Sequence, residues 1–555
     1  MIHIYFTEQD KTAVVPEGTT ILEAARKAGI VVESPCDGMG TCGKCKVQVK
    51  DRDRKNVICE DGRRKLKEEE IQAGYVLSCQ TKVYEDIEVI TVSTAAQNKS
   101  LKILSDGQSF SYEIKNYITK QFDGEKTSVY GGGKLLGEEN GDTTRALYGL
   151  SVDIGTTTVV TALINMITGE ELASASALNP QSLHAQDVLT RIKFASNEEG
   201  LAVMYNGITE EINHMIEEVA DQAGIRPENI YEVIYSGNTT MIHLATNVDP
   251  SSLGKFPYTP QIRGGNDISA DMLHISPFGL IYLPPIISSY VGPDITSGVL
   301  ASQLEKKKGT TLFIDIGTNG EMVIARDGSL SATSTAAGPA FEGMNITYGM
   351  RAGKGALESF EIDEEGNVNI HVIGDTKATG ICGSGLLDIV GELVRTGVIG
   401  ANGKLIAPEK GNYPESLKKY VVSLEGKPAF QVAEEVYLTQ KDIRQVQLAK
   451  GAVRAGIEAL LLSQQVSAEE VNLVEIAGSF GYHLRAKSLI NIGLLPKEFE
   501  GKVTFVGNTS KSGGKAFLLN TDLRRYMEKL VGDIESVELS NRDGFDKIFL
   551  KALNF

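Results

Sequence analysis

Residues 151–158 read SVDIGTTT, and residues 313–321 read FIDIGTNGE. Each stretch is an apolar run that ends in Asp-Ile-Gly-Thr, with Asp153 in the first and Asp315 in the second. An apolar strand that ends in a glycine turn, repeated at the start of two halves of a chain, indicates an internal duplication. We therefore predict an α/β fold of two lobes, residues 149–308 and 309–555, with a ligand cleft between them.

The chemistry of the Asp-x-Gly-Thr motif suits phosphate. The glycine allows a tight turn and close backbone approach, so that the amides and threonine hydroxyls after it can donate to phosphate oxygens. The aspartate at the strand end lies within reach of Mg²⁺ or its waters, which makes Asp153 and Asp315 the candidate catalytic residues. The candidate phosphate-binding residues are Gly155, Thr156, Thr157, Gly317, Thr318 and Asn319. An ordinary strand and turn in both places is the competing interpretation.

Further glycine loops support a nucleotide cleft. Among them, TGICGSGLLD (379–388) adds Gly383, Ser384 and Gly385, and IAGSFGYHL (476–484) adds Gly478 and Gly481 as candidates. The chain has no G-x4-G-K-S/T, so it is not a P-loop protein. It also lacks a G-x-S-x-G elbow and paired histidine ligands, which argues against a serine hydrolase and a zinc protease.

A separate metal motif lies near the N-terminus. Cys36, Cys42 and Cys45 fall in PCDGMGTCGKCKV (35–47), and Cys79 follows in YVLSCQT. This C-x5-C-x2-C spacing with a distant fourth cysteine is close to that of a plant-type 2Fe–2S ferredoxin. A structural zinc site remains the alternative, although zinc ligands usually come as two C-x2-C pairs.

The residues around the cysteines fit a ferredoxin domain over residues 1–94. IHIYF and TAVVP read as strands, ILEAARKAGI as a helix, and a strand near residues 87–92 should close a β-grasp fold. Residues 95–148 lose clear periodicity and read as a linker, or reduced middle domain, with one small element near SYEIKNYITK. Helices are predicted at ITEEINHMIEEVADQAG, ending at Gly224, and at TQKDIRQVQLAKGAVRAGIEALL, capped near Thr439.

The composition of the chain argues against some classes of partner and location. The chain has 555 residues, 41% hydrophobic, and a net charge of −17, which argues against binding to nucleic acid through phosphates. We expect no secretory signal and no membrane span, and six cysteines fit a reducing cytoplasm better than a disulfide scaffold.

These motifs carry a family resemblance. The twin DIGT motifs and the late AGSFG resemble the acetate and sugar kinase, Hsp70 and actin superfamily of ATPases. The combination with a ferredoxin domain, and with SGNTTMIHL, PPIISSYVGPDITSG, AGPAFEGMNITYGMRA and TGICGSGLLDIV, resembles the reductive activators of corrinoid proteins. The implied fold is α/β and multidomain: an α+β β-grasp ferredoxin followed by a duplicated, two-lobed, actin-like ATPase.

The resemblance implies a reaction. An ATP-dependent activator would pass one electron from a 2Fe–2S cluster on Cys36, Cys42, Cys45 and Cys79 to a Co(II) corrinoid protein, regenerating Co(I) for methyl transfer. It implies ATP and Mg²⁺ as further cofactors, with Gly478 and Gly481 at the adenosine. It also implies a low-potential electron donor, and it leaves a homodimer open. The family is expected to carry a middle domain before the ATPase, for which only residues 95–148 are available.

Three alternative functions are also compatible with the sequence. The protein could activate another low-potential enzyme, as dehydratase activators do, although those carry a cluster within the ATPase domain, where this chain has only Cys382. It could be a small-molecule kinase with a redox-sensing ferredoxin domain. It could also be an actin-like scaffold whose ferredoxin is a simple electron carrier.

Overall fold

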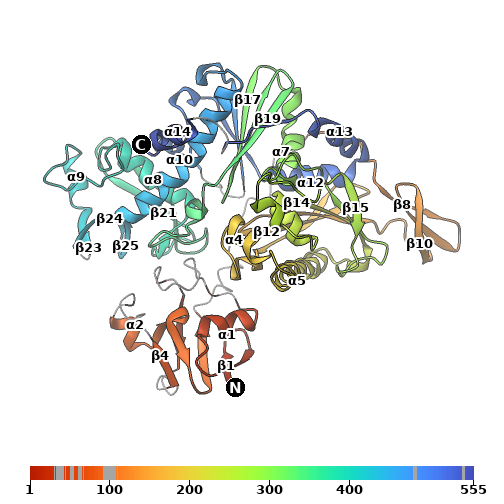
Figure 1. Cartoon of the computed structure of the whole chain (residues 1–555), viewed down its shortest axis with the longest axis horizontal. Coiled ribbons are helices and arrows are strands. Elements are labelled where there is room, and N and C mark those ends of the chain that lie inside the picture. The colour runs from red at the N-terminus through yellow and green to blue at the C-terminus, as the bar shows by residue number, and fades with distance from the viewer. Residues whose placement is uncertain are drawn as a thin grey trace.

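We describe the protein from a computed structural model of the chain (Figure 1). The structure describes residues 1–30, 32, 43, 45–50, 56–59, 66, 68–91, 108, 110–424, 426–478, 484–539 and 544–555. Within these residues, a small N-terminal sheet is followed by a three-stranded sheet and then by two six-stranded sheets with their helices.

The N-terminal domain is a five-stranded sheet with one main helix. Its strands lie in the order β2-β1-β7-β3-β5, with bounds β1 (Ile2–Phe6), β2 (Lys11–Val15), β3 (Lys46–Val49), β5 (Tyr75–Leu77) and β7 (Ile87–Thr91). Helix α1 (Ile21–Lys27) starts at a capping box between Thr20 and Glu23, which satisfies backbone groups that the helix leaves free. The predicted β-grasp order of strand, strand, helix and closing strand is confirmed.

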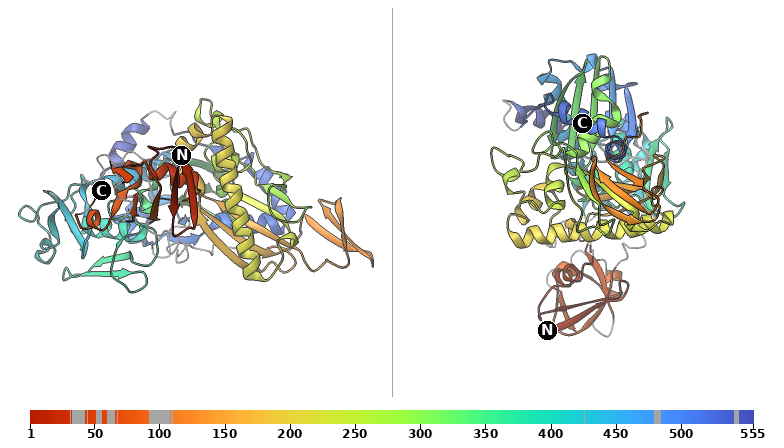
Figure 2. Two further views of the ribbon diagram at one scale, coloured as in Figure 1. Left: turned by 90° about the horizontal axis from the view of Figure 1, so that it is seen from below. Right: turned by 90° about the vertical axis from the view of Figure 1, so that its right-hand side faces the viewer.

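A three-stranded antiparallel sheet follows, where the sequence predicts only one small element. Its strands are β8 (Ile118–Phe122), β9 (Lys126–Gly131) and β10 (Lys134–Asn140), and it projects from one end of the molecule (Figure 2). The buried ammonium of Lys120 donates to Glu139 and to Tyr231 of the neighbouring sheet. Because polar contacts of this kind hold the strands, their sequence carries little apolar alternation to predict them from.

The first six-stranded sheet begins with the hairpin that carries the first DIGT motif. Its order is β13-β12-β11-β14-β16-β15, with bounds β11 (Tyr148–Ile154), β12 (Thr158–Asn165), β13 (Glu171–Leu178), β14 (Ile230–Gly237), β15 (Asn266–Ser269) and β16 (Leu280–Leu283). The helices between its strands are α4 (Val188–Phe194), α5 (Glu198–Ala223) and α6 (Thr239–Ala245). Helix α5 ends at Gly224, whose φ of +66° favours glycine, as predicted.

The second six-stranded sheet repeats this plan around the second motif. Its order is β27-β26-β17-β18-β19-β28, with bounds β17 (Thr310–Ile316), β18 (Gly320–Arg326), β19 (Ser329–Thr335), β26 (Leu473–Ala477), β27 (Val503–Gly507) and β28 (Glu535–Ser536). In each sheet the motif strand pairs antiparallel with the next strand and parallel with a later one, β14 or β26. The predicted α/β class and duplicated architecture are confirmed.

The second half carries additional elements beside its sheet. Their bounds are β20 (Ala356–Ile362), β21 (Val368–Val372), β22 (Gly380–Ile381), α8 (Gly383–Arg395), α9 (Glu415–Lys418), β23 (Val421–Leu424), β24 (Lys427–Ala433), β25 (Val436–Thr439), α10 (Gln440–Ser463), α11 (Ala486–Asn491), α13 (Thr521–Val531) and α14 (Phe545–Ala552). Helix α10 begins after Thr439, which forms a capping box with Asp442, as predicted. Its buried face packs into the largest apolar core of the chain.

Two helices meet between the sheets, near the centre of Figure 1: α7 (Pro293–Ser302) and α12 (Thr509–Leu519). They approach so closely that a Cβ on Gly513 would lie 2.1 Å from the carbonyl oxygen of Ser297. Helix α12 also reaches the first sheet, where the Ser151 hydroxyl donates to the Lys511 carbonyl. The end of the chain therefore returns to the first lobe. None of the described helices is long and apolar enough to cross a membrane.

Candidate functional site

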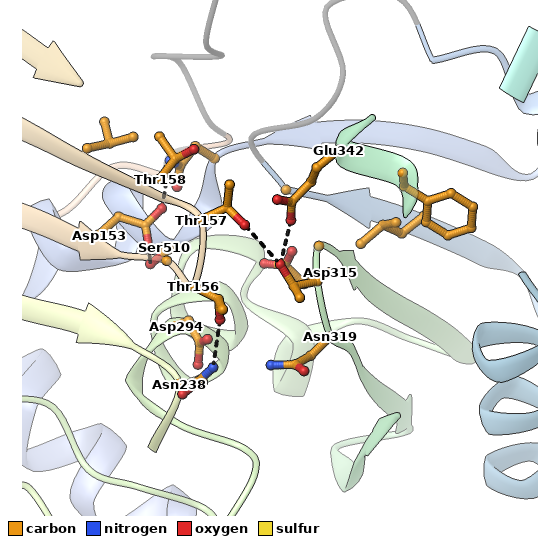
Figure 3. A pocket seen from close by; sticks show the side chains of 18 of the residues that line it. Asp153, Thr156, Thr157, Thr158, Asn238, Asp294, Asp315, Asn319, Glu342 and Ser510 are labelled. Carbon is orange, nitrogen blue, oxygen red and sulfur yellow. Dashed lines mark hydrogen bonds between the residues drawn. The ribbon is translucent and has the colours of Figure 1, made fainter. Parts of the chain in front are cut away.

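A cavity of about 180 Å³ lies where the two motif hairpins face each other. Residues from both halves of the chain line it, and Figure 3 shows their side chains converging on one space. Most of the residues predicted for the nucleotide site belong to this lining: Asp153, Gly155, Thr156, Thr157, Asp315, Gly317, Thr318, Asn319, Gly383 and Gly478. The fold thus brings together segments that are far apart in the sequence.

The first loop, residues 155–157, is a tight connection between β11 and β12. The Gly155 amide donates to the Thr158 carbonyl at 3.0 Å, and a Cβ on Gly155 would lie 2.6 Å from that oxygen. Only glycine fits this turn. Directly before it, the Asp153 carboxylate accepts from the Asn508 amide and the Ser510 hydroxyl, both at 2.9 Å. The start of α12 therefore holds Asp153 in place.

The second loop, residues 317–319, makes the equivalent connection between β17 and β18. Its Thr318 hydroxyl donates to the Glu342 carboxylate at 2.6 Å. The same hydroxyl lies 3.2 Å from the Thr157 hydroxyl of the first loop, so the two loops touch through their threonines (Figure 3). Groups that could donate to phosphate from both lobes therefore meet at one point.

Five carboxylates line the cavity: the predicted Asp153 and Asp315, and three that were not predicted, Asp294, Glu321 and Glu342. Burial raises the pKa of Asp315 to about 7, and the nearby charge of Asp153 adds to the effect. Burial, followed by the charges of Asp315 and Asp153, raises the pKa of Asp294 well above its ordinary value. Burial also raises the pKa of Glu321, and the charges of Asp294 and Asp315 raise it further. A divalent cation would relieve this crowding of like charges.

The arrangement suits magnesium better than a metal held by protein alone. Within the described part of the chain, no three such side chains are arranged as a complete metal site. Magnesium is usually bound by one or two carboxylates, with waters and substrate phosphates filling the other positions. The residues that could hold it are the aspartates at the ends of β11, β17 and the start of α7, namely Asp153, Asp315 and Asp294.

Three predicted residues of the glycine loops are placed differently or lie outside the described residues. The Ser384 hydroxyl donates to the Glu358 carbonyl at 2.9 Å, and Gly385 lies against the Leu357 carbonyl, where a Cβ would approach to 2.1 Å. Neither lines the cavity. Gly481 lies outside the described residues. Gly478 has a φ of +121° and lines the cavity beside Asp315.

Several lining residues were missed by the sequence analysis, and some carried a signal. Asn238 caps α6 in SGNTT, and Asn508 caps α12 in VGNTS, so Gly-Asn-Thr follows a strand in each half of the chain. This second repeat could have identified both asparagines. Glu321 is the last residue of the stretch FIDIGTNGE, and Asp294 is the second residue of α7, directly after Gly292 and Pro293.

The N-terminal domain holds the described part of the cysteine site. The sulfurs of Cys45 and Cys79 lie 3.2 Å apart and both residues are buried. This separation is far longer than a disulfide bond of about 2.05 Å, so the two residues form no disulfide with each other, and their sulfurs are adjacent, as two ligands of a metal cluster would be. Their mutual hydrogen bond, then burial, raises the pKa of the Cys45 thiol. Cys36 and Cys42 lie outside the described residues.

Family models match almost the whole chain. A 2Fe-2S iron-sulfur cluster binding domain matches residues 4–84, the RACo middle region matches residues 148–307, and the C-terminal domain of RACo, described as the ASKHA domain, matches residues 309–555. The matched middle region thus follows residues 95–148 and covers the segment for which the sequence predicts the first lobe.

Similar proteins cover most or all of the chain. A corrinoid activation enzyme, RamQ of Eubacterium limosum, is 29% identical over 100% of this chain and 99% of its own length. A [Co(II) methylated amine-specific corrinoid protein] reductase of Methanosarcina barkeri is 23% identical over 74% of this chain and 77% of its own. The solved structure of a reductive activator for corrinoid, iron-sulfur protein matches with a TM-score of 0.73 and 30% identity, over 100% of this chain and 98% of the other. With its ferredoxin domain and its duplicated ASKHA domain, the chain belongs to the family of reductive activators of corrinoid proteins.

Proposed function

We propose that this protein uses ATP to drive the transfer of one electron from a 2Fe–2S cluster to a Co(II) corrinoid protein, which returns the corrinoid to Co(I). The observation that carries the proposal is the presence, in one chain, of adjacent buried cluster cysteines and a cleft with paired phosphate loops. An electron carrier alone would not need the cleft. A kinase would not need the cysteines.

Energetics explains why the two sites belong together. A plant-type 2Fe–2S cluster supplies one electron at roughly −400 mV. Each ~59 mV by which the reduction potential of the corrinoid lies below that of the cluster lowers the one-electron equilibrium constant tenfold. Closure of the lobes on ATP would change how this protein binds the corrinoid protein. Tighter binding of the Co(I) form than of the Co(II) form would make the electron transfer feasible.

The nucleotide roles follow from the cleft lining. Thr156, Thr157 and Thr318 would donate to phosphate oxygens, and Asp153 and Asp315 would hold Mg²⁺ and orient the attacking water. Support comes from the position of all five residues in one cavity. Gly383 and Gly478, which also line it, would allow close approach of the nucleotide to the backbone.

The cluster would be held by Cys36, Cys42, Cys45 and Cys79. The buried, adjacent sulfurs of Cys45 and Cys79 fit two of its ligands. A low-potential electron donor must reload the cluster after each transfer, and we assign that role to a separate redox protein. We place the protein in the cytoplasm, where thiols stay reduced, and a homodimer remains compatible with the family.

The deciding experiment follows Co(I) absorbance anaerobically, with reconstituted protein, a Co(II) corrinoid protein and a strong one-electron donor. We expect Co(I) to accumulate only with MgATP, and the Cys45→Ala variant to abolish it. Cys59→Ser is the matched control, because Cys59 lies in the same domain outside the predicted ligand set. Equal Co(I) formation without ATP would favour a simple electron carrier, and phosphorylation of an added metabolite would favour a kinase.

A further inference from the structure

A fully buried arginine lies directly behind the first phosphate loop. Arg191 of α4 has no solvent-exposed surface. Its guanidinium donates to the carbonyls of Thr156 at 2.6 Å and Ala185 at 3.1 Å, to the side-chain oxygen of Gln181 at 3.1 Å, and to the sulfur of Met241 at 3.0 Å. Every nitrogen of the guanidinium therefore has a partner, and every partner is neutral.

A buried charge with only neutral partners is unusual, because burial of an ion normally requires a counter-ion. Arg524 gives the contrast within the same chain. It is 4% exposed, and its guanidinium lies 2.8 Å from Glu232 and 3.6 Å from Asp267. Arg191 makes no ion pair with any residue that the structure describes. Its positive charge is thus left without local compensation beside the cavity.

The carboxylates that act on Arg191 do so only from a distance. Burial lowers the pKa of Arg191 to about 9, and the charges of Asp187 and Glu342 oppose that shift. Asp187 is the partly exposed N-cap of α4, and its carboxylate oxygen accepts a hydrogen bond from the Thr190 amide. Glu342 lies across the cavity and accepts from Thr318. Neither one neutralises the guanidinium.

The contacts of Arg191 also complete a pattern in the loop. The Gly155 carbonyl accepts from the Asn179 side chain at 2.8 Å, and the Thr157 carbonyl accepts from the Asn179 amide at 2.9 Å. The Thr156 carbonyl between them accepts from Arg191. All three carbonyl oxygens of the loop are therefore held by donors of the segment behind it. A carbonyl that turned toward the cavity instead would repel a phosphate.

We propose that Arg191 is a positioning residue for the nucleotide phosphates: it fixes the Thr156 carbonyl away from the cavity, and its charge is balanced by phosphate bound at residues 155–157. This inference rests on the proposed binding of ATP in the cleft. The nucleotide then supplies the counter-charge that the protein omits. The effect of Arg191 should grow with the number of phosphates on the ligand and should vanish for adenosine.

The test uses the purified full-length protein without any corrinoid. Arg191→Met keeps the apolar length of the side chain and removes the charge, while Arg191→Lys keeps the charge. Arg524→Met is the matched control, because it removes a second buried arginine that faces carboxylates rather than the cavity. Thermal unfolding without ligand is measured first, and then equilibrium binding of adenosine, AMP, ADP and ATP with Mg²⁺.

Without ligand, we expect Arg191→Met to lower the unfolding temperature less than Arg524→Met does, because relief of an uncompensated buried charge offsets part of the lost hydrogen bonds. The Kd of Arg191→Met for MgATP should rise about tenfold or more, with smaller rises for ADP and AMP and none for adenosine. Arg191→Lys should recover part of the MgATP affinity. Arg524→Met should lower the unfolding temperature and leave the Kd for MgATP within about twofold, since it leaves Glu232 buried without its partner.

Two results would overturn the inference. One is unchanged MgATP affinity in Arg191→Met. The other is a loss of stability like that of Arg524→Met with an equal loss of affinity for adenosine and ATP, which would make Arg191 a purely structural residue. If the wild type binds MgATP but forms no ATP-dependent Co(I), the proposed function fails on its own.

Discussion

The two Asp-Ile-Gly-Thr loops, which we propose to bind phosphate, share this sequence but are held by different contacts. The Asp153 carboxylate before the first loop accepts hydrogen bonds from Asn508 and Ser510. The Asp315 carboxylate before the second loop accepts none from the described residues. Behind the first loop, a charged guanidinium holds the Thr156 carbonyl, whereas in the second loop the Thr318 carbonyl accepts from a backbone amide, that of Gly338.

This difference separates the roles of the two loops. Burial raises the pKa of Asp153, but its two hydrogen bonds favour the ionised form and oppose the rise. The pKa of Asp315 is raised to about 7 with no such opposition. We therefore propose that Asn508 and Ser510 favour the ionised Asp153 that a metal would need. Asp315 would release a proton if it became a metal ligand.

The largest effect is expected for Asp315 itself. Asp315→Ala should lower the rate of ATP hydrolysis ~10²–10³-fold, because the metal loses a carboxylate ligand that stabilises charge in the transition state. The rate is measured as phosphate release at saturating Mg²⁺. Asp363→Ala, at a partly exposed aspartate of the same half of the chain that does not line the cavity, is the control. Activity within a few-fold of the wild type in Asp315→Ala would remove Asp315 from the metal site.

The next effect concerns pH and stability. Because the folded state raises the pKa of Asp315 from its ordinary 3.8 to about 7, the folded protein binds this proton more tightly than the unfolded chain. The resulting stability is present below about pH 4 and is lost as pH rises through about 7. Between pH 4 and pH 8 without Mg²⁺, Asp315→Asn should lose about 1–3 kcal/mol less unfolding free energy than the wild type.

Urea unfolding at several pH values measures this difference. Added Mg²⁺ and nucleotide should restore the stability of the wild type at pH 8 and leave Asp315→Asn unchanged, because only the wild type gains the metal ligand. Parallel stability curves for the two proteins would mean that Asp315 is already ionised without ligands.

The first loop can be made to resemble the second. The double variant Asn508→Ala, Ser510→Ala removes both donors to Asp153, so its pKa should rise toward that of Asp315. Since hydrogen bonds to charged groups are worth ~1.5–3 kcal/mol each, the rate of ATP hydrolysis should fall about tenfold or more, with a larger loss at pH 6 than at pH 8.

The control for this variant lies on the same helix. Ser512→Ala removes a hydroxyl that donates to the Asn508 carbonyl and does not contact Asp153. It should retain the pH profile of the wild type. A double variant whose loss is the same at every pH would show that α12 supports the site only through its position.

The overall fold could be predicted from the sequence because it depends on repeated motifs and on hydrophobic periodicity. The twin motifs, the β-grasp order and the ends of α5 and α10 at Gly224 and Thr439 are local signals, and the structure places them as expected. The three-stranded sheet β8–β10 was underestimated, because contacts such as Lys120 with Tyr231 depend on the fold rather than on local pattern.

The cleft was only partly predictable for the same reason. Asp153 and Asp315 stand in motifs whose chemistry can be read directly from their neighbours. Asp294 and Asn508 reach the cleft from helices far away in the sequence, and Arg191 reaches the back of the first loop. Only packing of α7 against α12 and of α4 behind the loop brings them there. Asn508 stands in a repeated Gly-Asn-Thr, but the local sequence of Asp294 and Arg191 gives no charge pattern that distinguishes them from surface residues.

The smallest effect concerns the threonine contact between the loops. Thr157→Val removes one hydroxyl contact, at 3.2 Å to Thr318. Thr318→Val also removes the donor to Glu342, whose second carboxylate oxygen already has no hydrogen-bond partner. Because a buried acceptor left unpaired costs ~1–3 kcal/mol, Thr318→Val should destabilise the unliganded protein by about 1 kcal/mol more than Thr157→Val.

Urea unfolding of both variants and of the double variant completes a double-mutant cycle. This cycle should give a coupling energy of about 0.5–1 kcal/mol for the contact between the loops. Equal destabilisation by the two single variants would mean that Glu342 finds another donor, and no coupling would mean that the loops are independent without nucleotide.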